Sequence, residues 1–232
     1  MKFDLSDGTI PLLTTKKVHT KSIIHELLWM ISGSGNEWDL RKTGTTIWQE
    51  WADPETGDLG PVYGVLWRKW PSKNGPIDQL GTIIERLKNN PNDRRLLVTA
   101  WHPELLPQQK LPPCHYSFQF WVGNGKLSLL VNQRSCDVGL GVPFNIVQYS
   151  FLLRMVAHVT GLLPGELTWN GGDVHIYENH IEQLKEQITR IPNPSPHFKF
   201  NRSVIDIDDF KYEDFVVENY LSHPAIKLDV AV

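Results

Sequence analysis

Apolar residues recur along the chain with two different periods, which predicts a mixture of helices and strands. Over residues 19–32 the apolar positions are three and four residues apart, as on one face of a helix. The same spacing predicts a helix over 76–90. The run 146–160 is apolar on nearly every face, which is typical of a buried helix, and Gly161 is a natural end for it. A surface helix with outward charges is expected over 178–190.

Aromatic and β-branched residues gather in shorter runs that predict strands. The clearest of these runs are 96–101, 115–122, 126–133 and 167–177. A Gly-Asn-Gly turn sequence at 123–125 separates two of the runs, so these two predict a hairpin. The sequence Gly-Gly-Asp at 171–173 predicts a bulge in the last strand.

Polar residues are concentrated on both sides of the predicted hairpin. Cys114 comes directly before it, and the charged segment 134–137 follows and passes into a glycine-bearing loop that stops at Asn145. Polar residues between apolar elements are costly to bury without partners, so the rim of a cleft is their expected place. A thiol facing an arginine suggests attack on an anionic substrate, because the arginine favours the thiolate. The alternative is an inert core cysteine, which is what free cysteines usually are.

Composition and charge restrict the classes of function. The chain has 232 residues without a linker, a repeat or a low-complexity break, so a single domain over 1–232 is expected. Its formal net charge of −3 gives no basic field for a nucleic acid duplex, so an anionic partner must be met by local arginines. Two cysteines in a chain of this size indicate a reduced, cytoplasmic protein. The pattern shows no signal peptide, no membrane-spanning run and no metal signature.

Four further candidates have two readings on sequence alone. Glu26 interrupts an apolar helix, and it is either a structural acid satisfied by a buried donor or a functional group. Trp48, Trp51 and Tyr63 stand among turn residues, where aromatic side chains line pockets or cap a core. The core is the commoner place for such residues.

Two pairs of polar residues can also be explained without a functional role. Arg94 and Arg95 are adjacent, as in a solvated basic patch. In a strand they would point to opposite faces, so one site in the same subunit could hardly use both. His175 and Tyr177 alternate onto one face, and a structural hydrogen-bonded pair is the default interpretation.

Three long motifs, in order, carry a resemblance that favours functional over purely structural roles for these residues. They read PPCHYSFQF, QRSCDVGLGVPFNIVQYSFLLRMVAHVTGLLPGE and GGDVHIYENHIEQLK, and with them the chain from Met1 to Val232 closely resembles the thymidylate synthase family. The resemblance implies an α/β (α+β) domain around a large mixed β-sheet, and a symmetric homodimer formed through that sheet. It implies reductive methylation of deoxyuridylate (dUMP) to thymidylate (dTMP), with 5,10-methylenetetrahydrofolate as carbon donor and reductant and with no metal.

The resemblance also implies a role for particular residues. The residues implied for catalysis are Cys114, which adds to C6 of the pyrimidine, Glu26, Tyr63, Asn145 and Arg134. Those implied for the nucleotide are Arg94, Arg95, Arg134, Ser135, Asp137, Asn145, His175 and Tyr177. Those implied for the folate are Lys16, Trp48, Trp51, Asp137, Leu140, Gly141, Phe144 and Val232. Arg94 and Arg95 are expected to reach the nucleotide of the partner subunit, and the tail that ends at Val232 is expected to fold over the ligands.

Two alternatives stay open beside methylation. A deoxyuridylate hydroxymethylase shares every step until water replaces the hydride, and the retention of Trp48 and Trp51, which exclude that water, favours methylation. The chain also starts after the usual N-terminal helix and Arg-Thr-Gly loop of the family, whose arginine binds phosphate, so an inactive nucleotide-binding homologue is the second alternative. The Asn145 amide complements uracil or, flipped, cytosine. Related cytidylate hydroxymethylases carry a carboxylate there, and its absence favours uracil.

Overall fold

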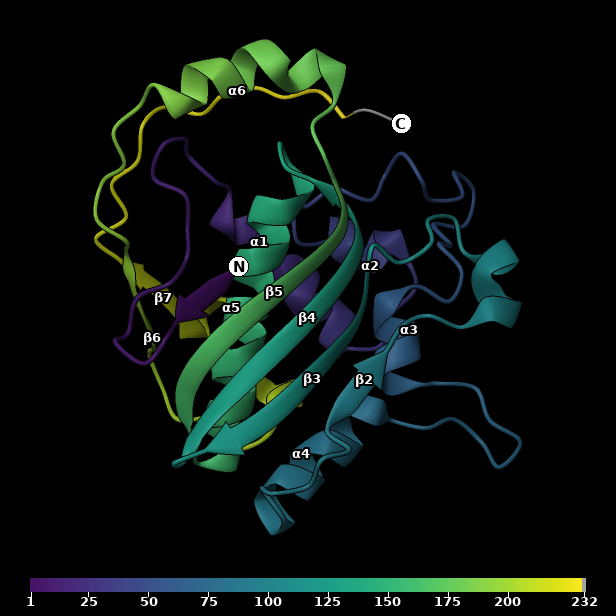
Figure 1. Ribbon diagram of the computed structural model, residues 1–232. Coiled ribbons are helices and arrows are strands. Elements are labelled where there is room, and N and C mark those ends of the chain that lie inside the picture. Colours follow the sequence, from purple (N-terminus) through teal and green to yellow (C-terminus); the bar gives the residue numbers. More distant parts are fainter. Residues whose placement is uncertain (231–232) are drawn as a thin grey trace.

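A five-stranded mixed sheet forms the centre of the computed structural model, which describes residues 1–230 (Figure 1). The strands of this sheet are β1 (Lys2–Asp4), β2 (Leu97–Thr99), β3 (His115–Gly123), β4 (Lys126–Asp137) and β5 (Leu163–His175). Their spatial order is β1-β5-β4-β3-β2. The pair β4 and β5 is parallel and the other neighbours are antiparallel. The expected α/β fold around a large mixed sheet is confirmed.

Helices and a small second sheet complete the fold. The α-helices are α1 (Thr20–Ile31), α2 (Glu37–Arg41), α3 (Tyr63–Arg68), α4 (Gln79–Asn89), α5 (Gly141–Thr160) and α6 (Ile181–Ile188). Short 3-10 turns are η1 (Pro103–Gln108), η2 (Glu178–His180), η3 (Ile207–Asp209) and η4 (Tyr212–Asp214). The second sheet pairs β6 (His197–Phe200) with β7 (Phe215–Glu218), antiparallel.

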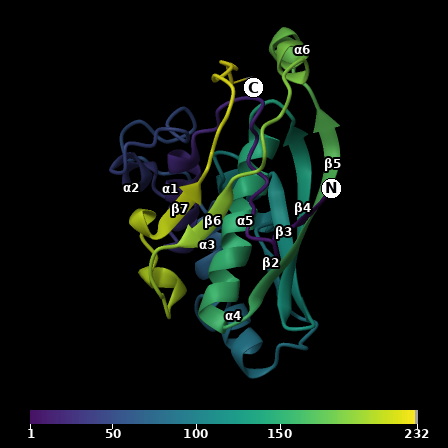
Figure 2. The same cartoon turned by 90° about the vertical axis from the view of Figure 1, so that its left-hand side faces the viewer.

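Helix α5 is the central element of the core. It lies between the large sheet and the β6–β7 pair (Figure 2). On one side the ring of Phe151 is 5.0 Å from that of Phe198 in β6 and 5.5 Å from that of Phe215 in β7. Elements on several sides explain why the helix is apolar on nearly every face. It ends as predicted at Gly161, whose φ of +70° is the left-handed conformation that glycine adopts most readily.

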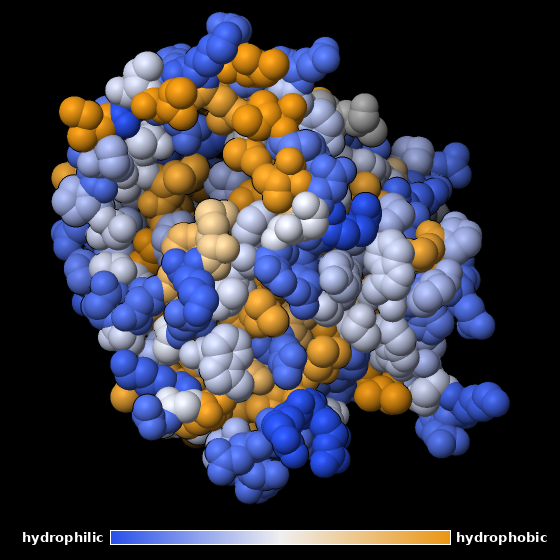
Figure 3. All heavy atoms as spheres, in the orientation of Figure 1, coloured by the Kyte–Doolittle hydropathy of each residue, from blue (hydrophilic) through white to orange (hydrophobic). Residues whose placement is uncertain are grey.

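The other face of the large sheet is open in the part of the chain that the structure describes. Figure 2 shows no helix of residues 1–230 on this side, and Figure 3 shows apolar side chains among polar ones over it. Leu97 of β2 and Trp121 of β3 are 47% and 40% exposed. An open sheet face that carries large apolar side chains is typical of a surface that binds another protein chain.

Several element boundaries differ from the predictions for physical reasons. Strand β4 continues through the charged segment 134–137, because β5 pairs with it in parallel as far as Asp137 and His175. Helix α5 starts at Gly141 rather than 146, so Asn145 belongs to the helix and not to a loop. Helix α4 starts three residues later than predicted, because Asp78 caps it by accepting a hydrogen bond from the Gly81 N–H at 2.8 Å.

Two further expectations about local structure were wrong. The predicted bulge at 171–173 is absent: the pairs Gln133–Gly171 and Ser135–Asp173 keep one register, and the shift falls between Leu127 and Leu129. Arg94 and Arg95 precede β2, in agreement with a predicted strand that begins at residue 96. The segment 178–190 begins with a 3-10 turn whose last residue, His180, is fully buried.

Candidate active site

Cys114 lies at the start of β3, half buried, beside two residues from other elements. Its backbone N–H donates to the hydroxyl of Tyr63 at 2.8 Å, and the Arg134 backbone N–H donates to its carbonyl at 2.8 Å. These two bonds fix the cysteine between α3 and β4. Cys114 and Cys136 are both free thiols, and Cys136 is fully buried. Of the two, Cys114 is the one whose thiol is influenced by a nearby arginine, Arg134.

The charge beside Cys114 comes from Arg134. Its guanidinium donates from Nε to the Pro113 carbonyl at 2.9 Å and from Nη2 to the Pro112 carbonyl at 3.0 Å, and it lies 5.6 Å from the centre of the Trp101 ring. Burial raises the pKa of Cys114, while the Arg134 charge and hydrogen bonds from Ser135 and Tyr63 lower it. The net shift is upward, so Arg134 offsets burial only in part. The arginine nevertheless stabilises the thiolate, as the sequence suggested.

Glu26 is held in a buried network with Trp48 and Gln148. The carboxylate is 8% exposed and accepts hydrogen bonds from Trp48 Nε1 at 2.6 Å and from Gln148 Nε2 at 2.7 Å. Burial raises its pKa to about 7, and the two hydrogen bonds oppose that rise. The structural interpretation of Glu26 is confirmed, because both of its oxygens have donors, and a pKa near 7 is also what a general acid or base would need.

The burial of Glu26 has a measurable effect on stability. Its pKa rises from 4.5 to about 7 on folding, so the folded chain binds the proton more tightly, and stability falls as pH rises through this window. Relative to the Glu26→Gln variant, the wild type should lose about 2 to 3 kcal/mol of unfolding free energy between pH 5 and pH 8. Urea unfolding of both proteins at each pH measures this difference. A difference that is constant with pH would contradict the raised pKa.

The aromatic candidates Trp48, Trp51 and Tyr63 all belong to the core or pack against it. Trp48 and Tyr63 are buried in the core, as sequence favoured, and Trp51 is partly buried against it. The ring of Tyr63 stacks on His115 with centroids 4.1 Å apart and is 6.0 Å from Trp48 in an edge arrangement. Because its hydroxyl also contacts Cys114, Tyr63 joins the Glu26 network to the thiol.

The amide of Asn145 has a defined orientation, which the sequence left open. Trp169 Nε1 is only a donor, and it lies 2.9 Å from Gln133, so the Gln133 atom facing it is the oxygen. The Gln133 nitrogen then donates to Asn145 at 3.0 Å, so the Asn145 atom facing it is also the oxygen. Among residues 1–230 the Asn145 amide nitrogen has no acceptor, so the side chain offers a donor and, at its oxygen, one remaining acceptor position.

Asp137 and Lys16 organise the first turn of α5. The Asp137 carboxylate accepts hydrogen bonds from the N–H groups of Gly139, Leu140 and Gly141 at 2.8, 3.2 and 3.4 Å. Lys16 is buried rather than solvated, and its Nζ donates to the Gly139 carbonyl at 2.6 Å. Burial lowers the pKa of Lys16, and the charge of Asp137 opposes that effect.

A cavity of about 180 Å³ adjoins this turn. It is lined by Lys16, Lys17, Val18, His19, Gly139, Leu140, Pro143, Phe144 and Ile226. Three of the residues assigned to the folate by resemblance, Lys16, Leu140 and Phe144, thus share one apolar cavity with a cationic side. This chemistry fits a ligand with an aromatic body and an anionic tail. Val232, assigned to the same ligand, lies outside the described residues.

His175 and Tyr177 lie together at the end of β5. Their rings are 5.0 Å apart in an edge arrangement, and His175 pairs in register with Asp137 of β4. His175 Nδ1 also lies 3.4 Å from a carboxylate oxygen of Asp173. The structure therefore places the pair at the same end of the sheet as Asp137, although Tyr177 lies beyond the last residue of β5.

Arg94 and Arg95 are not brought to this site within one chain. Both are exposed, and Arg95 Nε is 3.6 Å from Asp93. Leu97 pairs with Gln119, which places Arg95 level with Trp121. The strand from Cys114 to Trp121 is about 23 Å long at about 3.3 Å per residue. No side chain spans that length, so the two arginines can serve such a site only in a second copy of the chain.

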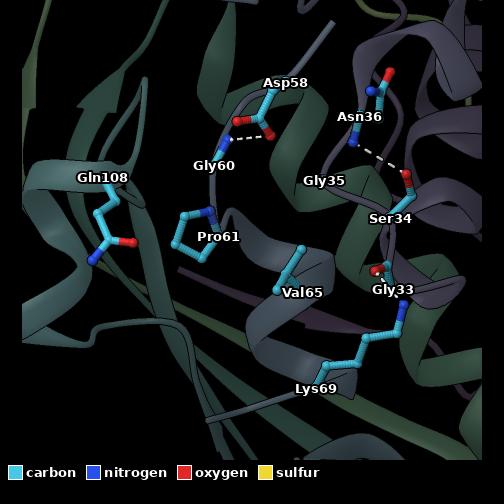
Figure 4. A pocket seen from close by; sticks show the side chains of 10 residues that line it. All are labelled: Gly33, Ser34, Gly35, Asn36, Asp58, Gly60, Pro61, Val65, Lys69 and Gln108. Atoms are coloured by element: carbon cyan, nitrogen blue, oxygen red, sulfur yellow. Dashed lines mark hydrogen bonds between the residues drawn. The ribbon is translucent and has the colours of Figure 1, made fainter. Parts of the chain in front are cut away.

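A larger cavity among the described residues lies elsewhere. It measures about 580 Å³ and is lined by Gly33, Ser34, Gly35, Asn36, Asp58, Gly60, Pro61, Val65, Lys69 and Gln108 (Figure 4). Figure 4 shows Lys69 turned to the Gly33 carbonyl, to which its Nζ donates at 3.1 Å. The cavity contains none of the residues assigned to catalysis or binding, so its size alone does not mark the active site.

A half-buried thiol, a buried acid with a pKa near 7 and an adjacent arginine are typical of enzymes that use a cysteine nucleophile. The family model of thymidylate synthase matches residues 1–232, which is the whole chain, and the protein belongs to the thymidylate synthase family. Membership implies an enzyme of the methyltransferase type, with chemistry of the deoxyuridylate methylation kind. The family binds deoxyuridylate and uses methylenetetrahydrofolate as co-substrate.

Four residues of the site were missed by the sequence. Gln133, Gln148, Trp169 and His180 are buried beside the candidate residues, and the first three hydrogen-bond to them or to one another. Gln148 had a signal, because it interrupts an apolar helix as Glu26 does. The contact partners of Trp169 and His180 are far away in sequence, so no local pattern marks them. Within residues 1–230, no helix is both long and apolar enough to cross a bilayer.

Proposed function

We propose that this protein catalyses the reductive methylation of deoxyuridylate to thymidylate with 5,10-methylenetetrahydrofolate, through addition of the Cys114 thiolate to C6 of the pyrimidine. The observation that carries the proposal is the placement of Cys114 between Tyr63 and Arg134. A cysteine used only for packing would need no cation, whereas a nucleophile gains its reactive form from one.

The nucleotide would be held from β4, α5 and the end of β5. Arg134 and Ser135 would bind the phosphate, because arginine and hydroxyl donors both complement its oxygens. Asn145, oriented by Gln133, would read the uracil edge, and Asp137 would support this end of the pocket. His175 and Tyr177 would bind the deoxyribose hydroxyl at the end of β5.

The proton at C5 would be removed by way of Tyr63 and Glu26. Tyr63 has its hydroxyl at the backbone of Cys114, and Glu26 is bonded to Trp48, which stands 6.0 Å from the Tyr63 ring. A carboxyl group with a pKa near 7 exchanges protons readily at neutral pH, so ordered water between the two groups could carry the proton.

The folate would lie against the first turn of α5. Lys16, Leu140 and Phe144 line the cavity there, and Asp137 and Gly141 form the turn beside it. Trp48 and Trp51, with rings 5.9 Å apart, would keep water from the reacting carbon. When bound, the co-substrate supplies one carbon and one hydride. The residues of the chain orient it and exclude the water that would otherwise give a hydroxymethyl product.

We further propose a single-domain homodimer that forms through the open sheet face, in a reducing, cytoplasmic setting. One contiguous core cluster supports the single domain, and two free cysteines support the reducing setting. The exposed Leu97 and Trp121 support the choice of face. In such a dimer Arg94 and Arg95 would contact the phosphate in the partner's site, which they cannot reach in their own chain.

Formation of dihydrofolate tests this function directly. Incubation with deoxyuridylate and methylenetetrahydrofolate should give the absorbance change of dihydrofolate, together with a nucleotide product heavier by one methyl group. Absorbance spectroscopy and mass spectrometry measure the two. A hydroxymethyl product without dihydrofolate would identify a deoxyuridylate hydroxymethylase. Tight nucleotide binding without any product would identify an inactive homologue.

The relay that orients Asn145 gives a separate prediction. Trp169→Phe removes the Nε1 donor that fixes Gln133, so the Gln133 amide can reverse and present the wrong atom to Asn145. We expect kcat/KM for deoxyuridylate to fall about fivefold, the effect of one hydrogen bond of ordinary strength. Steady-state kinetics measure the fall. An unchanged value at full folding would show that Asn145 needs no relay.

A further inference from the structure

His180 has no part in the reaction proposed above, yet it is one of the most completely buried polar residues. It stands at the start of α6 with 0% of its surface exposed. Its Nε2 lies 2.7 Å from the backbone carbonyl of Asp229, and its Nδ1 lies 3.6 Å from a carboxylate oxygen of Asp137. Because a carbonyl only accepts, Nε2 carries the proton of that bond. The imidazole ring thus donates to the Asp229 carbonyl and lies beside Asp137 at the end of β4 without a hydrogen bond to it.

The Asp229 carbonyl belongs to a tail segment, residues 221–230, that has no regular secondary structure. Figure 1 shows this segment running beside α6. Arg190 holds its beginning through Nη1, which donates at 2.8 Å to the carbonyls of both Pro224 and Thr15. Near its end, the described side chains that donate to it are those of His180 and Asn179, the latter at 3.4 Å to the same carbonyl. The shorter bond comes from His180.

Both ends of this connection reach the proposed folate cavity. Ile226 of the tail segment lines that cavity together with Leu140 and Phe144. Asp137 accepts hydrogen bonds from the N–H groups of Gly139 and Leu140, which line the same cavity. His180 therefore contacts both the tail segment, at Asp229, and the Gly139 turn beside the cavity.

The His180 ring is closely packed by its neighbours. A Cβ added to Gly139 would lie 2.6 Å from His180 Nδ1, and Tyr177 meets the ring edge-on at 5.7 Å. Nδ1 is buried without a hydrogen-bond partner among residues 1–230, a cost that an apolar residue would not incur. The hydrogen bond from Nε2 to the tail segment explains why a histidine stands here despite the cost of burying Nδ1.

We propose that His180 is a positioning residue that fastens the tail segment over the folate end of the active site, through the hydrogen bond from its Nε2 to the Asp229 carbonyl while its ring packs against Gly139. The inference rests on the proposed function for its consequence, which is the retention of the folate. The contact between His180 and Asp229 does not depend on that function. Loss of the bond should therefore open the tail segment whether or not the protein turns over substrate.

Two substitutions separate the two nitrogen atoms of the ring. His180→Gln can place an amide nitrogen near the Nε2 position and keep the bond to Asp229, whereas His180→Asn reaches only the Nδ1 position and loses it. Trypsin cleavage after Lys227, whose side chain is 88% exposed, reports opening of the tail segment. Loss of one hydrogen bond should raise the cleavage rate of His180→Asn about fivefold, with His180→Gln within about twofold of wild type.

Kinetics give the second measurement. His180→Asn should raise KM for methylenetetrahydrofolate about fivefold and KM for deoxyuridylate by a smaller factor, because Ile226 of the tail segment lines the proposed folate cavity. A histidine that serves general stability would instead lower both affinities and the melting temperature together. Equal cleavage rates in the two variants, or a wild-type rate in His180→Asn, would overturn the proposal.

A third variant covers the case in which His180 cannot be replaced without unfolding. Gly139→Ala keeps the histidine and pushes its ring, because the new Cβ would stand 2.6 Å from Nδ1. It should accelerate cleavage after Lys227 as His180→Asn does, and a wild-type rate would count against the proposal. Absence of dihydrofolate formation in the wild type would refute the proposed function alone, since cleavage is measured without turnover.

Discussion

Replacing Cys114 by serine should lower the turnover of deoxyuridylate by about a thousandfold or more, because a hydroxyl is far less nucleophilic than a thiolate. Arg134 assists the sulfur by stabilising its negative charge, but it cannot ionise an alcohol. Nucleotide binding should persist, since the arginine, Ser135 and Asn145 are untouched. Initial rates of dihydrofolate formation and equilibrium binding of deoxyuridylate measure the two properties.

Cys136 provides the matched control. It is the only other cysteine, is fully buried, and donates weakly to the Gln133 carbonyl at 3.5 Å, a bond that serine can also make. Cys136→Ser should therefore retain turnover within about tenfold of wild type, with the loss arising from packing. Near-normal turnover in Cys114→Ser would refute the nucleophile assignment.

Two inactive variants should restore activity to each other when their subunits are mixed. A Cys114→Ser chain lacks the nucleophile, and a chain with Arg94→Ala and Arg95→Ala lacks the phosphate contacts that we assign to the partner's site. A mixed dimer then contains one intact site, built from the cysteine of one chain and the arginines of the other. Random exchange makes half of the dimers mixed, so about a quarter of wild-type activity is expected. Rates after denaturation and joint refolding measure it.

A second mixture distinguishes shared sites from a general effect of refolding. Asn145 is held by Gln133 of its own chain, so Cys114→Ser and Asn145→Ala damage the same half of every site. Their mixture should stay inactive. Recovery there, or no recovery with the arginine variant, would contradict the donation of Arg94 and Arg95 across the dimer.

Much of the secondary structure followed from periodicity, and the failures share a cause. The helix over 20–31, the hairpin of β3 and β4 and the stop at Gly161 were confirmed because local sequence determines them. The extension of β4 through 134–137 was missed because its partner β5 lies far along the chain. A polar segment becomes a strand when a neighbour satisfies its backbone, and no local pattern shows that neighbour.

The candidate site divides in the same way. Residue types pointed to Cys114 and Arg134, and resemblance supplied the roles of Lys16 and Phe144 before the structure placed both at one cavity. The relay from Trp169 to Asn145 connects residues that are far apart in sequence, and it depends on which amide atom faces which donor. Such information exists only in three dimensions. The exposed positions of Arg94 and Arg95 likewise acquire a meaning only when a second chain is considered.

The edge strand β1 delays completion of the large sheet during synthesis of the chain. Its residues Lys2–Asp4 pair with Glu166, Leu167 and Thr168, which are made more than 160 positions later. At ribosomal speeds of about 5–20 residues per second, the first strand waits about ten to thirty seconds for its partner. During that time it is an unpaired β-segment, open to chaperones or to the wrong neighbour. Contacts of such long range also slow the final folding step. Refolding of the complete chain should therefore be slow even when the folded protein is stable.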